Sequence, residues 1–399
     1  MALCAMMGTA TLTSCEGTLD DVFGEWSRPT KTETTPSIEE TPLTIEAVEA
    51  GTIKVIYQGD LTLPKPITYI KNGVSTSITA STDITVAAGD VVSFSSENSR
   101  VNDDATGWLN ILADHKIYVY GNVMSLINDE GDFSKDKTIS GDYALAGLFQ
   151  DNAQLYNHPE KKLLLPATTL SEACYHGLFR GCYSLSKAPE LPATTLAAGC
   201  YRQMFRYCTA LTTAPELPAT TLTQECYSDM FFNCPALTTA PALPATTLAE
   251  DCYYEMFEIC TGLTTAPTLP ATTLAENCYY NMFRKCTGLT TAPALPATTL
   301  AKKCYYCMFE GCTALETAPV LPATTLVGHC YTGMFWNCSK LSSVSCKATS
   351  EINSSNLSSW LEKAGTDATS PTLHVTSGHK DDGWNLPINP DTWTIVEDL

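Results

Sequence analysis

The phrase Leu-Pro-Ala-Thr-Thr-Leu occurs seven times in this chain of 399 residues without a change of letter. Every interval between copies is 26 residues, and the copies begin at Leu165, Leu191, Leu217, Leu243, Leu269, Leu295 and Leu321. A fixed period between about 20 and 50 residues is typical of solenoids, in which each repeat buries its apolar face against its neighbours. We therefore expect residues 165–345 to form one array of seven stacked repeats.

Within the repeat, numbered from its first Leu, positions 10, 11, 14, 15 and 18 are apolar. In the segment Cys278–Cys286 these positions fall on one side of a helix with 3.6 residues per turn. The segment Leu289–Ala292 is β-prone and ends at Pro293, which lacks the N–H that a longer strand would need. We predict an α/β solenoid of leucine-rich repeats, with one short parallel strand and one helix per repeat. A right-handed β-helix is the alternative, but it would not use the apolar helical face.

The turn that follows this face supports a family resemblance. The segment Phe283-Arg284-Lys285-Cys286-Thr287-Gly288-Leu289 and its six equivalents resemble the BspA-like leucine-rich repeats of bacterial surface proteins. The resemblance covers nearly half of the chain. It implies a surface lipoprotein of Gram-negative bacteria that contacts host proteins, other cells or glycans, and it carries over no catalytic residues.

Both ends of the array are expected to be capped, because the outer face of a terminal repeat meets water. Residues 128–164 contain a degenerate copy in which Leu148-Phe149 stands for Met-Phe, while Ala144 and Asn152 take the two Cys positions. Residues 346–399 share no repeat from Lys347 onward, so we predict a separate C-terminal cap there.

The N-terminal segment 1–15 ends in Leu12-Thr13-Ser14-Cys15, which resembles the lipobox of bacterial lipoproteins. The resemblance implies lipidation of Cys15 and a surface-exposed place at the outer membrane, with the lipid as the only membrane contact. A plain N-terminal segment is the alternative. Residues 16–42 are rich in Thr, Pro and Glu and are predicted to be a flexible tether.

Residues 43–127 are predicted to form a small antiparallel β-sandwich-like domain. Asn72-Gly73 is a strong signal for a hairpin turn after the strand-like stretch Ile67–Ile70. Further strands are predicted at Leu43–Val48, Thr52–Tyr57, Ile84–Ala87, Val91–Ser95 and Ile117–Val123. We expect this sandwich-like domain to act as a spacer.

Cysteine is abundant, with 18 residues, of which 14 occupy positions 10 and 18 of the repeat. If the intervening segment is helical, the two positions lie roughly 12 Å apart, beyond the roughly 7 Å Cα limit for a disulfide. We therefore predict free thiols stacked in buried rows. One C-x-x-C occurs, at Cys304 and Cys307, but without the second pair of a structural zinc site, so no metal is expected.

Charge and motifs exclude several classes of function. The net charge of −20 and the absence of a basic cluster argue against binding to nucleic acid. The chain contains no HExxH, no GxSxG and no Gly-rich phosphate loop. We therefore expect neither an enzyme nor a cofactor.

Recognition is expected at positions that vary between repeats, namely 9, 12, 13, 16 and 26. On the helical wheel, positions 9, 12, 13 and 16 point away from the apolar side. The candidate binding surface consists of aromatic residues at positions 12 and 16: Phe232, Tyr254, Tyr280, Tyr306 and Trp336. Such side chains provide a large contact area at low entropic cost. Alternatively, the tyrosines lie flat over neighbouring repeats and complete the packing.

These observations predict a monomeric, non-catalytic adhesion protein that binds macromolecules on host or neighbouring cells. The alternative is a glycan-binding surface lipoprotein for carbohydrate capture, in which the aromatic residues or the sandwich would hold the sugar.

Overall fold

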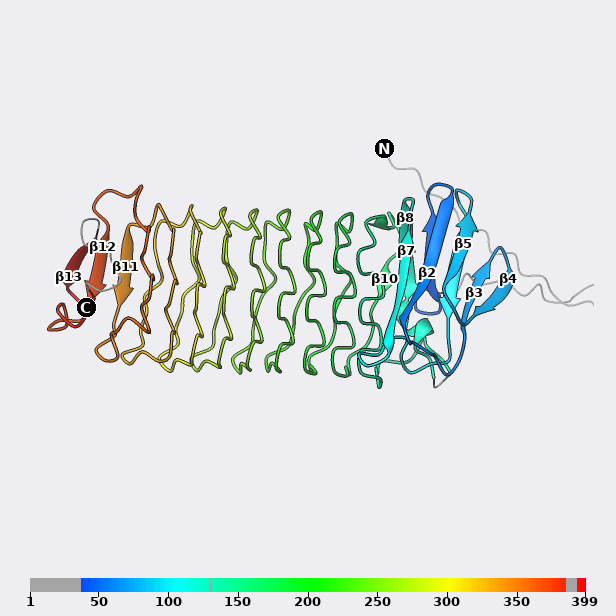
Figure 1. Cartoon of the computed structure of the whole chain (residues 1–399), viewed down its shortest axis with the longest axis horizontal. Helices are drawn as coiled ribbons and strands as arrows, with labels where there is room; N and C mark the ends of the chain where they lie inside the picture. Colours follow the sequence, from blue (N-terminus) through cyan, green and yellow to red (C-terminus); the bar gives the residue numbers. More distant parts are fainter. Residues whose placement is uncertain (1–36, 130, 385–392) are drawn as a thin grey trace, which may run out of the picture. The chain divides into compact units, whose positions relative to one another are not determined.

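The computed structural model describes residues 37–129, 131–384 and 393–399. The predicted lipidation site Cys15 and most of the predicted tether lie outside these residues. Within them, Ser37–Leu399 form one compact unit. Figure 1 shows its two parts, a group of β-strands at the N-terminal side and a succession of coils that follows.

The N-terminal part holds two sheets. The larger has the order β10-β8-β1-β6-β3-β4, with β9 also paired to β8, and the smaller has the order β5-β2-β7. The strands are β1 (Leu43–Ala47), β2 (Gly51–Gly59), β3 (Ile67–Lys71), β4 (Val74–Ile78), β5 (Thr82–Val86), β6 (Val91–Ser95), β7 (Gly107–Ala113), β8 (Ile117–Asn122), β9 (Leu155–Asn157) and β10 (Leu163–Leu164). The five strands predicted by range correspond to β1, β2, β5, β6 and β8. Side chains from both sheets share one buried apolar cluster.

The hairpin predicted at Asn72-Gly73 is confirmed. β3 and β4 pair antiparallel, with Lys71 opposite Val74, so the two turn residues connect the strands directly. Both have positive φ, 51° at Asn72 and 77° at Gly73. Two consecutive positive φ values define the type I′ turn that matches the twist of a hairpin.

The prediction of one helix per repeat is wrong, and with it the α/β leucine-rich-repeat fold. The described residues contain no α-helix, and their only helical element is the 3₁₀ turn η1 (Val123–Leu126). The segment Cys278–Cys286 and its equivalents form a run of tight turns instead. The apolar side chains at positions 10, 11, 14, 15 and 18 are nevertheless buried.

Backbone hydrogen bonds explain how a run of turns can replace the helix. N–H groups at even positions donate within their own coil to the carbonyl three residues earlier, as Met282 does to Tyr279 at 3.3 Å. N–H groups at odd positions donate to the next coil, as Phe283 does to Met308 at 2.9 Å. Since buried backbone groups must be paired, this alternation gives each N–H group of the segment a hydrogen-bond acceptor, as a helix would.

A left-handed residue recurs every fourth position and rules out a helix. In one coil Asn277, Asn281 and Lys285, at positions 9, 13 and 17, have φ values of 53°, 53° and 58°. The same three positions have positive φ in all seven repeats. Each is the third residue of a hydrogen-bonded turn, as in a type II turn, whereas a non-glycine residue in an α-helix avoids this region.

The residue types at positions 9, 13 and 17 carry a signal that the apolar pattern obscured. Eleven of the 21 residues at these positions are Gly, Asn or Asp, the types that adopt positive φ most readily. The five glycines are Gly177, Gly181, Gly199, Gly311 and Gly333. Residues that favour turns at a four-residue spacing therefore predict consecutive turns rather than a helix.

Replacing Lys285 by glycine tests the turn assignment. Lys285 is exposed with φ 58°, and Gly311 occupies the same position in the next coil. We expect Lys285→Gly to raise the free energy of unfolding by about 1 kcal/mol, because a left-handed L-residue is disfavoured by roughly 1–2 kcal/mol. If Lys285 were in a helix, the same substitution would instead lower the free energy of unfolding by about 1 kcal/mol. Urea unfolding, with Lys285→Ala as a near-neutral control, gives the sign that decides between them.

The remaining part of each coil is held by single parallel bridges. One row joins residues at position 23, such as Thr265 to Thr291, and a second row joins residues at position 5, such as Thr273 to Thr299. The strand predicted at Leu289–Ala292 is therefore reduced to one bridge before Pro293. The repeats form a helix-free solenoid of turns and bridges, which uses the apolar face that had argued against a β-helix.

The core of the solenoid consists of identical side chains stacked from coil to coil. Phe283 lies parallel to Phe257 and Phe309, with ring centroids 5.7 Å apart on both sides. Tyr279 is stacked between Tyr253 and Tyr305 in a second row, at 5.8 and 5.7 Å. Both rows are buried. Each coil therefore completes the core of its neighbours.

Cysteines form two further buried rows. All sixteen cysteines in the described part of the chain are free and buried. At position 18 the thiol donates a weak hydrogen bond to the preceding coil, as from Cys286 Sγ to the carbonyl of Phe257 at 3.1 Å. Burial raises the pKa of Cys174, Cys226 and Cys260 to about 12. These thiols are packing groups with little thiolate character.

The sandwich closes the first end of the solenoid. The degenerate copy forms a turn coil, with positive φ at Tyr143, Gly147 and Asp151. No coil precedes it, so four of its carbonyls must be paired by the sandwich. Backbone N–H groups donate to two of them, Val101 to Ala144 and Ile111 to Leu148. Side-chain amides donate to the other two, Asn102 to Ala146 and Asn110 to Gln150. An open ladder end is thereby paired, which prevents another chain from adding to it.

The C-terminal residues also continue the coil, although their sequence from Lys347 onward shares no repeat. The carbonyls of Asn356, Ser358, Trp360 and Glu362 accept the N–H groups of Tyr331, Gly333, Phe335 and Asn337. Strands β11 (Ser343–Cys346), β12 (Thr372–Val375) and β13 (Thr394–Glu397) form a parallel sheet. The Trp360 ring takes the place of the repeated Met and packs at 5.9 Å from Trp384.

Candidate functional site

Three of the five predicted surface residues come together in one stack. Tyr254 and Tyr280 lie face to face with centroids 4.7 Å apart, and Tyr280 and Tyr306 follow at 4.6 Å. All three are half-buried. Burial raises the pKa of the Tyr280 phenol to about 12, so the stack is uncharged at neutral pH. We call these three residues the tyrosine stripe.

The other two predicted residues do not join the stripe. The Phe232 ring is only 8% exposed and lies beneath the Arg206 guanidinium, whose central carbon is 3.8 Å from the ring centroid. Trp336 is half-buried. The helical wheel predicts both to point outward, whereas the Phe232 ring is covered by Arg206. Phe232 is thus a packing residue.

The tyrosine stripe ends at a hollow. In the following two coils its row continues with the small residues Thr332 and Ser358, so one face of the Tyr306 ring has no aromatic neighbour. A hollow of about 360 Å³ opens there, lined by Tyr280, Lys303, Tyr306, His329, Thr332, Ser354 and Ser358. We call it the stripe hollow. The step from tyrosine to threonine along one row therefore creates a recess with an aromatic wall.

Polar groups in the stripe hollow are hydroxyl groups, which can donate and accept hydrogen bonds, together with two basic side chains. Lys303 and His329 line it, and no carboxylate does, although the chain carries a net charge of −20. The wall is fixed by hydrogen bonds from Thr332 Oγ1 to the Ser355 carbonyl at 3.0 Å and from the His329 N–H to Asn356 Oδ1 at 2.9 Å. Such a recess can hold a ligand that stacks on an aromatic ring and accepts hydrogen bonds.

The stripe hollow contains one pair of a histidine and a hydroxyl group. His329 Nδ1 lies 3.5 Å from Thr332 Oγ1, longer than the roughly 2.6–3.2 Å expected between a base and its nucleophile. The threonine hydroxyl also donates its proton to a backbone carbonyl. This pair is therefore arranged for packing and contact rather than for proton abstraction.

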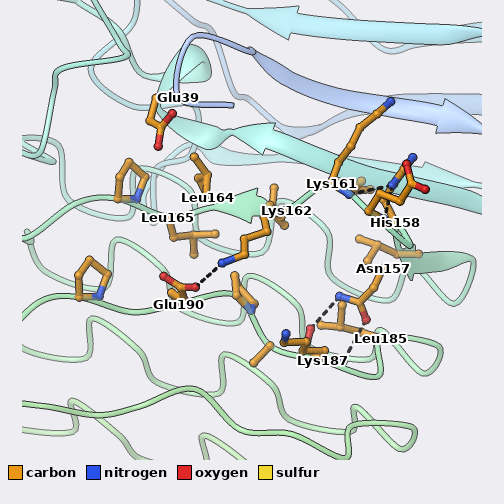
Figure 2. Close-up of a pocket in the computed structure, with 18 of the residues that line it drawn as sticks. Glu39, Asn157, His158, Lys161, Lys162, Leu164, Leu165, Leu185, Lys187 and Glu190 are labelled. Carbon is orange, nitrogen blue, oxygen red and sulfur yellow. Dashed lines mark hydrogen bonds and ion pairs between the residues drawn. The ribbon is translucent and has the colours of Figure 1, made fainter. Parts of the chain in front are cut away.

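A second recess lies where the strands meet the first repeats, and sequence reasoning missed it. Figure 2 shows this cavity, which has a volume of about 580 Å³ and which we call the junction cavity. Its walls come from β8, β9, β10 and the coils around Leu165 and Leu185. The segment from Leu155 to Leu165 is four residues longer than its equivalents in the array, and this insertion was the available sequence signal.

Charged side chains surround the junction cavity. Lys162 Nζ pairs with Glu190 Oε1 at 2.8 Å, and Lys161 Nζ pairs with Glu46 at 3.2 Å while lying 4.1 Å from the Tyr120 ring centroid. His158 packs edge-on against Tyr120 at 5.2 Å. Burial, followed by the charge of Lys161, lowers the pKa of His158, so this imidazole is neutral at pH 7. The ammonium groups are therefore the cations of this site.

Neither recess has the features of a metal centre. Among residues 37–129, 131–384 and 393–399, no group of three or more His, Cys, Asp or Glu side chains is placed to hold a metal ion. No helix within those ranges has the length and apolar character needed to cross a membrane.

Comparison of the chain with protein-family models, with curated proteins and with solved structures finds no match. The resemblance to BspA-like repeats therefore stays a prediction, while the helix predicted from the apolar periodicity is absent from the described residues.

Proposed function

We propose that this chain is a non-catalytic binding protein that recognises macromolecules on host or neighbouring cells through the tyrosine stripe and its hollow. The observation that carries the proposal is the free face of Tyr306 above a recess lined by hydroxyl groups, Lys303 and His329. Aromatic rings that are rigidly supported and flanked by polar groups are favoured contacts in recognition surfaces.

Rigidity supports this assignment. Tyr280 is held between two parallel rings, and the backbone beneath it is bonded to both neighbouring coils. A ligand therefore meets side chains that are already ordered, so little conformational entropy is lost on binding. The predicted lipid anchor at Cys15 would hold this surface outside the cell, as part of the same proposal.

Glycan capture is a second candidate, favoured by the lining of the stripe hollow. Thr332, Ser354 and Ser358 provide hydroxyl groups beside the aromatic wall of Tyr306. A neutral sugar requires this combination of an apolar ring face and several hydrogen-bonding groups. A protein ligand would instead insert a side chain into the same recess.

Filling the stripe hollow tests the proposed function. Thr332→Tyr continues a row that already holds tyrosine in three coils, so we expect the fold to persist while the recess closes. Binding to a panel of matrix proteins and to a glycan array should fall at least about 10-fold, the effect of losing a contact worth about 1.4 kcal/mol. Tyr306→Ser should weaken the same ligands. The panel that loses its signal identifies the ligand class.

The matched control is Tyr183→Ser, which removes an exposed tyrosine elsewhere on the array. Its binding should equal that of the unmodified protein. Retained binding by Thr332→Tyr, with an unchanged circular dichroism spectrum, would contradict the role of the stripe hollow.

A further inference from the structure

The junction cavity has the size and walls of a small-molecule site. Its volume of about 580 Å³ lies within the roughly 300–1,000 Å³ that is usual for such sites. The half-buried side chains of Leu163 and Leu164 contribute apolar wall, together with Pro159, Pro166 and Pro192. Figure 2 shows Leu164 beside the extended side chain of Lys162. The cavity therefore offers an apolar surface next to a cation.

The wall of the junction cavity is rigidly held. Asn157 in β9 bonds to both backbone groups of Lys187 in the first repeat, with Nδ2 donating to the carbonyl at 2.8 Å and Oδ1 accepting from the N–H at 2.9 Å. β10 is bonded in turn to β8. Elements 30 residues apart in sequence thus form one continuous wall, so the cavity exists before any ligand binds.

Cations gather at this cavity although the protein is strongly acidic. Lys137, Lys161, Lys162 and Lys187 line it together with the carboxylates Glu39, Glu160 and Glu190, so the lining has one more lysine than carboxylate in a chain with a net charge of −20. Glu190 is paired with Lys162. The hydrogen bond and charge of Lys162, and then the charge of Lys187, lower the pKa of this carboxyl. Two ammonium groups therefore share one carboxylate, which leaves room for a second anion.

We infer that the junction cavity binds an amphipathic organic acid, with its apolar body against Leu163, Leu164 and the neighbouring prolines and its carboxylate between Lys162 and Lys187. The apolar wall selects for a hydrocarbon body, since burial of apolar surface is the main source of affinity there. The lysines select for a negative head. A neutral polar ligand would leave the leucine wall uncovered, and a cation would meet two positive charges.

Titration calorimetry of the full chain with butanoate, hexanoate and octanoate tests both halves of this inference. Affinity should rise about 4-fold for each added methylene group that becomes buried. Octanoate should bind at least about 5-fold more tightly than octylammonium, and its affinity should fall with added salt, as expected for partly exposed ion pairs. Equal binding of octanoate and octylammonium would overturn the inference.

Variants localise the binding. Lys187→Gln and Lys162→Gln should each weaken octanoate binding by about 5-fold, the effect of an exposed ion pair. Lys162→Gln also releases Glu190, which then repels the ligand. The control Lys303→Gln lies in the stripe hollow and should leave octanoate binding unchanged. Unaltered affinity in the double variant Lys162→Gln/Lys187→Gln would exclude this cavity, whatever the outcome for macromolecular ligands of the stripe.

Discussion

Replacing Phe283 by alanine should lower the free energy of unfolding by about 3–5 kcal/mol, the usual range for a fully buried phenylalanine. The ring is completely buried and stacked between Phe257 and Phe309, each 5.7 Å away. Truncation leaves a gap inside a continuous row, which neither neighbour can close because its own backbone is bonded to the adjacent coils. Equilibrium unfolding in urea, followed by circular dichroism, measures the loss.

Tyr183→Ala is the comparison for this variant, since Tyr183 is an exposed aromatic residue of the same array. Its effect should stay within about 0.5 kcal/mol, as for most surface substitutions. A loss below about 1 kcal/mol for Phe283→Ala would show that the row does not stabilise the solenoid cooperatively.

Replacing Arg284 by alanine should lower the free energy of unfolding by about 3 kcal/mol at neutral pH. Its Nη1 lies 2.7 Å from Glu258 Oε1 and its Nε lies 2.9 Å from Glu310 Oε2. The two carboxylate side chains are only 5% and 11% exposed. Removing the shared cation leaves both charges with little solvation, and the loss of one partner from a buried pair typically costs about 3–5 kcal/mol. Part of the arginine is exposed, so the lower value applies.

The effect of Arg284→Ala should depend on pH. Burial, and then the charge of Glu255, raise the pKa of Glu258 in the folded protein. A raised carboxyl pKa favours folding below the unfolded value of 4.5, and this contribution is lost as pH rises through the folded pKa. Without Arg284 the pKa rises further, so the destabilisation should be larger at pH 7 than at pH 4.

Arg180→Ala is a matched control, because Arg180 occupies the same repeat position but its guanidinium donates to the Gln203 amide oxygen. At pH 7 its effect should be small, because no buried carboxylate loses its partner. The comparison is made at pH 7, since burial, and then the charges of Arg202 and Arg180, lower the pKa of His176 to about 4. A loss for Arg284→Ala that does not change with pH would show that Glu258 and Glu310 are not stabilised by this arginine.

The apolar pattern alone could not distinguish a helix from consecutive turns. Apolar residues at positions 10, 14 and 18, and at 11 and 15, recur every four residues, which suits both a helix face and a series of four-residue turns. Backbone conformation at the polar positions between them decided the outcome. Positive φ at Asn277, Asn281 and Lys285 permits turns and excludes the helix.

The candidate sites were only partly accessible from sequence. The row Tyr254, Tyr280 and Tyr306 could be read from the repeat register, because one position recurs in every coil. The hollow beside Tyr306 could not, because its far wall includes Ser354 and Ser358 from a coil whose sequence no longer matches the repeat.

The 26-residue period by itself determined that the chain forms a solenoid with rows of identical buried side chains, since copies at equal spacing must occupy equivalent environments. It also predicted the stacked rows of cysteines, whereas the helical separation from which free thiols were predicted does not apply to consecutive turns. Only the tertiary structure decided how the ends are closed and where cavities form. The Asn110 amide meets the carbonyl of Gln150, and Lys162 meets Glu190, only after the sandwich and the first coils have packed together. Such contacts depend on the three-dimensional arrangement of non-repeated segments, which no local pattern encodes.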